Sequence, residues 1–172
     1  KNSIEDVNSS GNFDYLVICL DSDDDTIEER HQQVLNFINE ESIILQESTK
    51  LVIIVQNKCF ETWFLGNPKI FKNNPASNFL VDCIKHYNVR NEDPELMEKP
   101  VDFEQTTAIF HSTYLQEILS ERKIQYSKKN PQEVTEKYFL TELIKRNRKT
   151  NHIKSFKHFI DFCHKIEQEI AE

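Results

Sequence analysis

The stretch "FDYLVICLDSDDD" at residues 13–25 decides the fold, because an apolar run leads directly into a cluster of carboxylates. A short apolar run rich in β-formers is typical of a strand that is covered on both faces. A second run of this type, "KLVIIVQN", occupies residues 50–57. Apolar residues recur at helical spacing over 26–40, where Thr26 or Asp25 can cap a helix. Strand, helix and strand predict a right-handed βαβ unit with parallel strands.

The rest of the chain is predicted to be mainly helical. The segment "FETWFLG" is expected to form a short helix that ends at Gly66, and residues 1–12 have the composition of a flexible lead-in. Further helices are expected at residues 76–87, 105–121, 132–147 and 151–170. We therefore predict an α/β protein. A partial Rossmann-like core would span residues 1–110, and a helical C-terminal region would span 111–172.

Composition restricts the class of protein. The chain has 172 residues, of which 38% are hydrophobic, enough to bury one core. No apolar run approaches the roughly 18 residues of a membrane span, and the N-terminus lacks the pattern of a signal peptide. The four cysteines show no C-x-x-C spacing, so we interpret them as reduced core residues. A cytoplasmic protein without a membrane segment is expected.

Charge is distributed unevenly along the chain, whose net value is −8. Residues 1–50 carry 3 basic and 12 acidic side chains, whereas residues 122–158 carry 11 basic and 3 acidic ones. This asymmetry suggests that one part of the protein holds cations and another holds an anion.

The aspartates that follow the first predicted strand are candidates for metal binding. Ligands gather at the carboxyl ends of strands in parallel sheets, and Asp21 ends this strand, with Asp23 two residues further on. Two carboxylates about 4 Å apart repel by roughly 4 kcal/mol at an effective dielectric constant of 20, so the pair favours a cation such as Mg²⁺. Asp24 and Asp25 are better explained as first-turn residues of the next helix.

Other motifs fit this segment less well. An EF-hand loop starting at Asp21 would need glycine and glutamate where the chain has Thr26 and Gln32. A haloacid dehalogenase phosphatase usually has threonine where this chain has Asp25. A dinucleotide fold would need a glycine-rich turn, and the whole chain has two glycines.

A third carboxylate, Glu61, lies six residues after Val55, in the segment that emerges beside the aspartates if the two strands are neighbours. Aromatic and aliphatic residues around it would bury this short helix against the sheet. Spacing alone leaves open whether Glu61 faces the cleft or the solvent.

Together these residues resemble the Toprim-domain nucleases of bacterial defence systems, including the RloB-like proteins and OLD-type relatives. The resemblance covers residues 14–66: a strand ending in D-x-D, a helix, and a second strand followed by "CFETWFL". It implies Mg²⁺- or Mn²⁺-dependent cleavage of DNA or RNA in anti-phage defence, together with an ATPase partner. Asp21, Asp23 and Glu61 would bind the metal, and Asp21 and Glu61 would be catalytic.

The chain departs from this family in one respect. Toprim domains usually begin with an earlier strand that ends in a glutamate, whereas here thirteen residues precede "DYLVICL" and Glu5 lies in a polar segment. Either the upstream half is lost, another chain completes the site, or the protein is catalytically silent. A non-catalytic interaction module of a defence complex is therefore the alternative, and a phosphatase acting through an aspartyl-phosphate on Asp21 is a third hypothesis.

The basic region supplies candidate nucleic-acid contacts. Lys128 and Lys129 lie in a predicted loop, where side chains can converge on a ligand, and Arg146 and Arg148 lie on a predicted helix. The alternative is an ordinary solvated helix surface. Single histidines such as His111 are more often core or surface residues than acid–base groups.

Overall fold

The computed structural model describes residues 2–171, except for the side chain of Gln132. This part of the chain is a mixed α/β structure with seven α-helices and a two-stranded parallel sheet. The elements in chain order are α1 (Asn2–Ser10), β1 (Tyr15–Asp21), α2 (Ile27–Glu40), β2 (Lys50–Gln56), α3 (Phe60–Leu65), α4 (Asn78–His86), α5 (Thr107–Glu121), α6 (Lys137–Thr150) and α7 (Lys154–Ala171). Short 3₁₀ helices lie at Pro68–Ile70, Pro94–Leu96 and Gln132–Thr135. Among the described residues, no helix is both long enough and apolar enough to cross a membrane.

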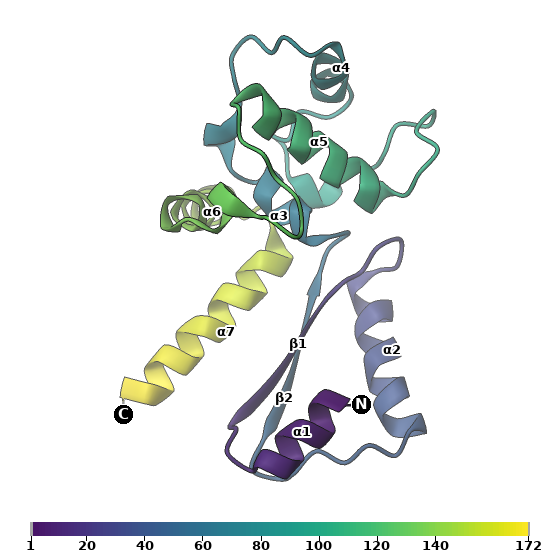
Figure 1. Cartoon of the computed structure of the whole chain (residues 1–172), viewed down its shortest axis with the longest axis vertical. Helices are drawn as coiled ribbons and strands as arrows, with labels where there is room; N and C mark the ends of the chain where they lie inside the picture. The colour runs from purple at the N-terminus through teal and green to yellow at the C-terminus, as the bar shows by residue number, and fades with distance from the viewer. Residues whose placement is uncertain (1, 172) are drawn as a thin grey trace.

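The two strands pair in parallel, as the sequence predicts. β1 and β2 run parallel, in a register that pairs Tyr15 with Lys50 at one end and Asp21 with Gln56 at the other. α2 and α7 flank the sheet, and α3, α4, α5 and α6 gather beyond its carboxyl end (Figure 1). The carboxyl ends of both strands therefore point at the helical part of the molecule.

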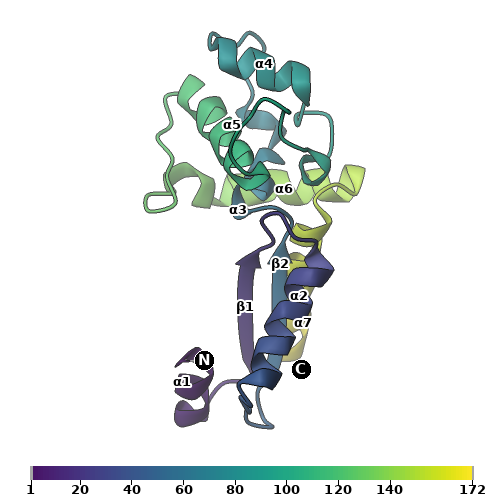
Figure 2. The same ribbon diagram turned by 90° about the vertical axis from the view of Figure 1, so that its right-hand side faces the viewer.

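β1 is less covered than its composition predicts, and this expectation was wrong. No residue of β1 is buried, and Val17 and Cys19 are exposed, whereas Ile54 in β2 is fully buried. The physical reason is the small size of the sheet: α7 packs on β2, and β1 pairs with no other strand of residues 2–171. One edge of β1 is accordingly open along its length (Figure 2). The prediction that all four cysteines are core residues fails at Cys19 for the same reason.

The core lies around α3, where the sheet meets the helical part. Trp63 and Leu65 of this helix are buried, and the Trp63 ring lies 5.4 Å from that of Phe156 in α7. The indole Nε1 of Trp63 donates a hydrogen bond to Ser155 Oγ at 2.7 Å. Fully burying side chains of this size contributes about 1.5–3 kcal/mol each. The hydrophobic segment after β2 thus fixes where α7 begins.

Two predicted helix boundaries are confirmed. Thr26 caps α2 by a capping box, in which its hydroxyl accepts from the Glu29 backbone N–H while the Glu29 carboxylate accepts from the Thr26 N–H. α3 ends at Gly66, where a Cβ would collide with the side chain of Ile153 and approach the Trp63 carbonyl oxygen to 2.8 Å. Glycine is therefore required at this position by the close approach of the chain before α7.

The flexible lead-in predicted at residues 1–12 is wrong over most of its length, because residues 2–10 form α1. Ile4 and Val7 are buried, and the side chain of Asn8 bonds with the segment before β2, donating to the Ile44 carbonyl oxygen and accepting from the Gln46 N–H. These tertiary contacts override the weak helix propensity of a segment rich in serine and asparagine.

Candidate metal centre

The segments that leave the two strands are held together directly beyond the sheet. Ser22, which is fully buried, donates from its backbone N–H to the Gln56 carbonyl oxygen, and its hydroxyl accepts from the Lys58 N–H; both distances are 2.9 Å. The Asp23 N–H donates to the Lys58 carbonyl oxygen at 2.9 Å. These bonds extend the pairing past the strand ends, so Asp21 lies beside the segment that becomes α3.

Glu61 faces the protein interior rather than the solvent. The side chain is 0% exposed, and its Oε1 accepts hydrogen bonds from Ser112 Oγ at 3.3 Å and Tyr126 Oη at 3.2 Å. Its Oε2 is buried and accepts no hydrogen bond from any described residue. A buried carboxylate oxygen without a donor costs free energy unless a cation compensates it. The alternative that the sequence left open is thus resolved: Glu61 points inward.

One lysine joins the two carboxylates. Lys128 Nζ lies 3.6 Å from Asp21 Oδ2 and 3.6 Å from Glu61 Oε2. The two oxygens are therefore separated by no more than twice this distance and face a common point. The Lys128 side chain is 66% exposed, whereas that of Asp21 is 25% exposed. The site is a pair of fixed acidic oxygens with an ammonium group that reaches it from the surface.

The electrostatics of the site follow from this arrangement. Burial raises the pKa of the Asp21 carboxyl above its ordinary value, and Glu61 raises it further, while Lys128 opposes the shift. The pKa of Lys128 is raised: burial works to lower it, but the charges of Glu61 and Asp21 prevail. Burial and the neighbouring Glu61 raise the pKa of the Tyr126 phenol, which therefore stays a hydrogen-bond donor at neutral pH.

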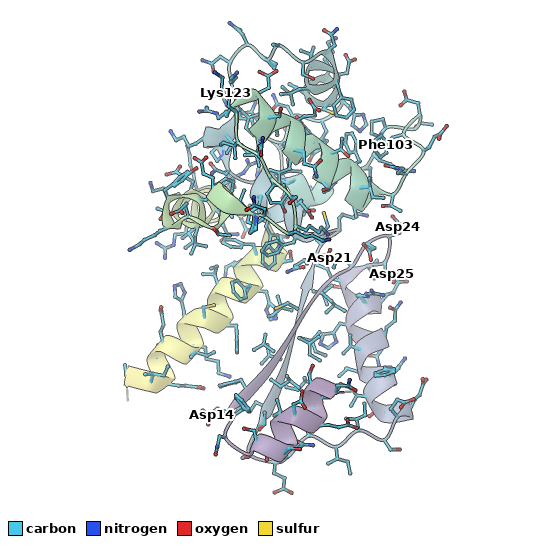
Figure 3. The ribbon with its side chains drawn as sticks, viewed as in Figure 1. Asp14, Asp21, Asp24, Asp25, Phe103 and Lys123 are labelled. Carbon is cyan, nitrogen blue, oxygen red and sulfur yellow. The ribbon has the colours of Figure 1, made fainter. Side chains whose placement is uncertain are left out.

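Asp23 does not join this pair. It is exposed and adopts a left-handed backbone conformation, with φ of 54°. Within residues 2–171, no group of three His, Cys, Asp or Glu side chains is arranged to hold a metal ion. Asp24 and Asp25 lie further along the chain, before Thr26, the N-cap of α2 (Figure 3), so the prediction that they belong to the first turn of this helix is wrong; Glu28 and Glu29 occupy that turn. The D-x-D motif therefore contributes one oxygen donor, Asp21, to the described arrangement.

Asp21 and Glu61 offer the type of oxygen donor that a divalent cation such as Mg²⁺ prefers. Mg²⁺ binds hard oxygen donors and usually takes one or two carboxylates, filling its remaining positions with water or with phosphate oxygens of a substrate. Glu61 Oε2, which accepts no hydrogen bond from a described residue, and the facing Oδ2 of Asp21 are such donors. The nearby Cys59 thiol is not a ready additional ligand: it is buried, and its pKa is raised to about 12, mainly by burial.

Buried hydrogen bonds between α3, α5 and the Met97 carbonyl oxygen hold α3 in position. His111 Nε2 donates to the Met97 carbonyl oxygen at 2.9 Å, so its Nδ1 is the acceptor for the Thr62 hydroxyl at 2.8 Å. Burial lowers the pKa of His111 to about 4, which keeps the ring neutral. His111 is thus a core residue that joins α5 to α3, one of the two environments, core or surface, that the sequence left open for it.

The four predicted nucleic-acid contacts occupy different environments. Arg146 is buried, and its guanidinium donates to the carbonyl oxygens of Gly66 and Val89 at 3.3 and 2.7 Å. It is therefore not available to a ligand, because backbone acceptors far apart in sequence hold it. Arg148 and Lys129 are exposed, and Lys128 reaches the acidic pair.

Ser112 and Tyr126 are the site residues that the sequence did not indicate. Both hydroxyls bond with Glu61 Oε1 from elements that follow it by 51 and 65 residues. No local pattern specifies that either hydroxyl faces a carboxylate.

Comparison of this chain with protein-family models, with curated proteins and with solved structures finds no match. Asp21, Glu61 and Lys128, through their geometry, are therefore the features of this chain that indicate a function.

Proposed function

We propose that this chain is a Toprim-like, divalent-metal-dependent nuclease that hydrolyses phosphodiester bonds of DNA or RNA in anti-phage defence, with Asp21 and Glu61 as metal ligands and catalytic residues. Mg²⁺ or Mn²⁺ held there would polarise a phosphate and lower the pKa of a bound water. The chain's own contribution is to fix two carboxylate oxygens at the carboxyl end of a parallel sheet, the usual place of ligand sites in such folds.

The single observation that carries this proposal is the state of Glu61. One oxygen of this fully buried carboxylate accepts no hydrogen bond from a described residue and is aimed at a point that Asp21 also faces, which is unfavourable unless a cation is nearby. Lys128 supplies only partial compensation, because its ammonium lies at 3.6 Å, beyond normal hydrogen-bond length.

Nucleic acid is the substrate class that best accounts for the charge pattern. A phosphodiester brings negative charge to an acidic pair, so cations are needed around the pair to hold it. Lys129 follows Lys128 in the same surface turn, and exposed Arg148 lies in the last turn of α6. These two residues remain in the proposed nucleic-acid surface, whereas Arg146 leaves it.

The alternative is a non-catalytic Toprim-like interaction module of a defence complex, in which an ATPase subunit is the partner. The observation that favours it is the outer edge of β1, which pairs with no strand within residues 2–171 and can accept a strand from another chain. A Toprim-like protein that has lost catalytic activity would also be expected to keep two site carboxylates rather than three.

The deciding experiment is a cleavage assay on single- and double-stranded DNA and RNA with Mg²⁺ or Mn²⁺. Asp21→Ala is the test variant, and Asp24→Ala is the matched control from the same acidic segment. We expect divalent-dependent cleavage that Asp21→Ala abolishes and Asp24→Ala preserves. Undiminished cleavage by Asp21→Ala rules out the assignment. Absence of both cleavage and divalent-ion binding by calorimetry, combined with tight partner binding, establishes the interaction module instead.

A further inference from the structure

The tip of the turn between α5 and α6 places a positive charge between the two carboxylates of the candidate metal centre. Lys128 Nζ is equally distant, at 3.6 Å, from Asp21 Oδ2 and Glu61 Oε2. A cation that these two oxygens share would occupy the same neighbourhood. The contacts of Lys128 therefore bear on how the site takes up a metal ion.

We propose that the Lys128 ammonium and a divalent cation exclude one another from the space between Asp21 and Glu61, so that Lys128 acts as an internal competitor that a metal ion displaces. This inference rests on the proposed metal site. It adds that the protein's apparent affinity for the ion is set in part by its own lysine.

Charge alone makes joint occupancy unfavourable. A divalent ion bound to either oxygen would stand a few ångströms from the ammonium, and their repulsion is about twice that between two unit charges at the same distance. The two acidic side chains supply two negative charges, which a divalent ion neutralises by itself. The ammonium then has no remaining electrostatic reason to stay.

The structure also identifies which partner moves. Glu61 is fully buried and held by hydroxyls of Ser112 and Tyr126, and Asp21 ends a strand. The side chain of Lys128 is 66% exposed, so its withdrawal into water gives up little packing. The acidic oxygens are fixed, whereas the lysine is free to leave.

The turn that carries Lys128 permits this movement without a backbone rearrangement. Ser127 and Asn130 close the turn by two reciprocal backbone hydrogen bonds, of 3.2 Å from the Ser127 N–H and 3.0 Å from the Asn130 N–H. Lys128 and Lys129 form its tip. A change of side-chain rotamer is thus sufficient to move the ammonium from the acidic pair to the solvent.

The first test measures the reactivity of the two lysines in the wild-type protein. Amine acylation is followed by mass spectrometry with and without saturating Mn²⁺, at ionic strength matched with NaCl because screening affects exposed charges. We expect Mn²⁺ to accelerate acylation of Lys128 severalfold and to leave Lys129 unchanged. Asp21→Asn should remove the acceleration. An unchanged Lys128 rate at saturating Mn²⁺ overturns the inference.

The second test measures Mn²⁺ affinity by calorimetry for wild type, Lys128→Gln and the control Lys129→Gln. Lys128→Gln should bind about fivefold more tightly, the factor expected if the ammonium holds the space about four-fifths of the time, whereas Lys129→Gln should match wild type. Equal or weaker binding by Lys128→Gln contradicts the competition. If wild type binds no divalent ion at all, the proposed function itself falls, and the inference with it.

Discussion

Glu61 and Lys128 form an ion pair in which one partner is fully buried and the other is 66% exposed, at 3.6 Å between Oε2 and Nζ. The two charged side chains therefore differ in whether they can move into the solvent. Lys128 can return to water at small cost, whereas Glu61 cannot leave the interior, where its other oxygen accepts from Ser112 and Tyr126. Burying a carboxylate away from water costs free energy, and a protein that keeps such a buried charge usually does so for function rather than for stability.

Replacing this charge should separate stability from metal binding. Glu61→Gln keeps an amide oxygen for the two hydroxyl donors and removes the buried negative charge, so we expect its free energy of unfolding in EDTA to equal or exceed that of wild type. In wild type, Mg²⁺ at a hundred times its dissociation constant should add about 2.7 kcal/mol. Thermal unfolding with and without Mg²⁺ checks this. An equal Mg²⁺ shift in Glu61→Gln would show that the ion binds elsewhere.

Arg146 and Arg148 should differ sharply although they lie two residues apart. Arg146→Ala removes a buried guanidinium that bonds with backbone carbonyl oxygens, including those of Gly66 and Val89, and leaves these acceptors unpaired. We expect a loss of about 3 kcal/mol in the free energy of unfolding. Exposed Arg148→Ala should stay within about 0.5 kcal/mol of wild type. Urea denaturation measures the free energy of unfolding of both variants. An Arg146→Ala variant as stable as wild type would refute the structural role of Arg146.

Nucleic-acid binding should depend on the exposed basic residues through salt. Each phosphate contact contributes about one counterion, so Lys129→Gln and Arg148→Gln should each reduce the slope of log affinity against log salt by about one. Fluorescence anisotropy with a labelled oligonucleotide between low and physiological salt measures this slope. Slopes that match wild type would place the nucleic-acid surface elsewhere on the protein.

Glu95 should anchor the start of α7. This buried carboxylate accepts from the backbone N–H groups of Lys154 and Ser155, at 2.8 and 3.0 Å, and from the Ser155 hydroxyl. Glu95→Ala leaves these donors unsatisfied and should cost about 2–3 kcal/mol. Glu104→Ala, at an exposed position nine residues further along the chain, serves as the control. Comparable stability of the two variants in chemical denaturation would contradict the capping role.

His111 should make stability depend on pH. Its pKa of about 4 in the folded protein lies below the ordinary value of 6.5, so the unfolded chain binds the proton more tightly. The contribution of the neutral ring is therefore present above about pH 6.5 and is lost as pH falls towards 4, by about 2 kcal/mol between pH 7 and 4.5. The free energy of unfolding is measured by chemical denaturation as a function of pH for wild type and for His111→Gln. Parallel pH profiles for the two proteins would exclude this linkage.

The sequence predicted the elements that local pattern controls. The alternation of apolar runs and polar segments gave two strands, the helix between them and, to within a few residues, the later helices. The end of α3 at Gly66, and Thr26 as one of two candidate caps of α2, could be predicted because they depend on residues close in the chain. α1 was missed because its stability comes from contacts of Ile4, Val7 and Asn8 rather than from helix propensity.

What the sequence by itself determined is that Asp21 ends a parallel strand, at the edge of the sheet where ligands gather. Only the tertiary structure decided that Glu61 faces inward, that Lys128 meets both carboxylates and that Arg146 is buried. The reason is physical: a strand end is set by a local hydrophobic pattern, whereas burial and charge pairing arise from packing between segments far apart in the chain.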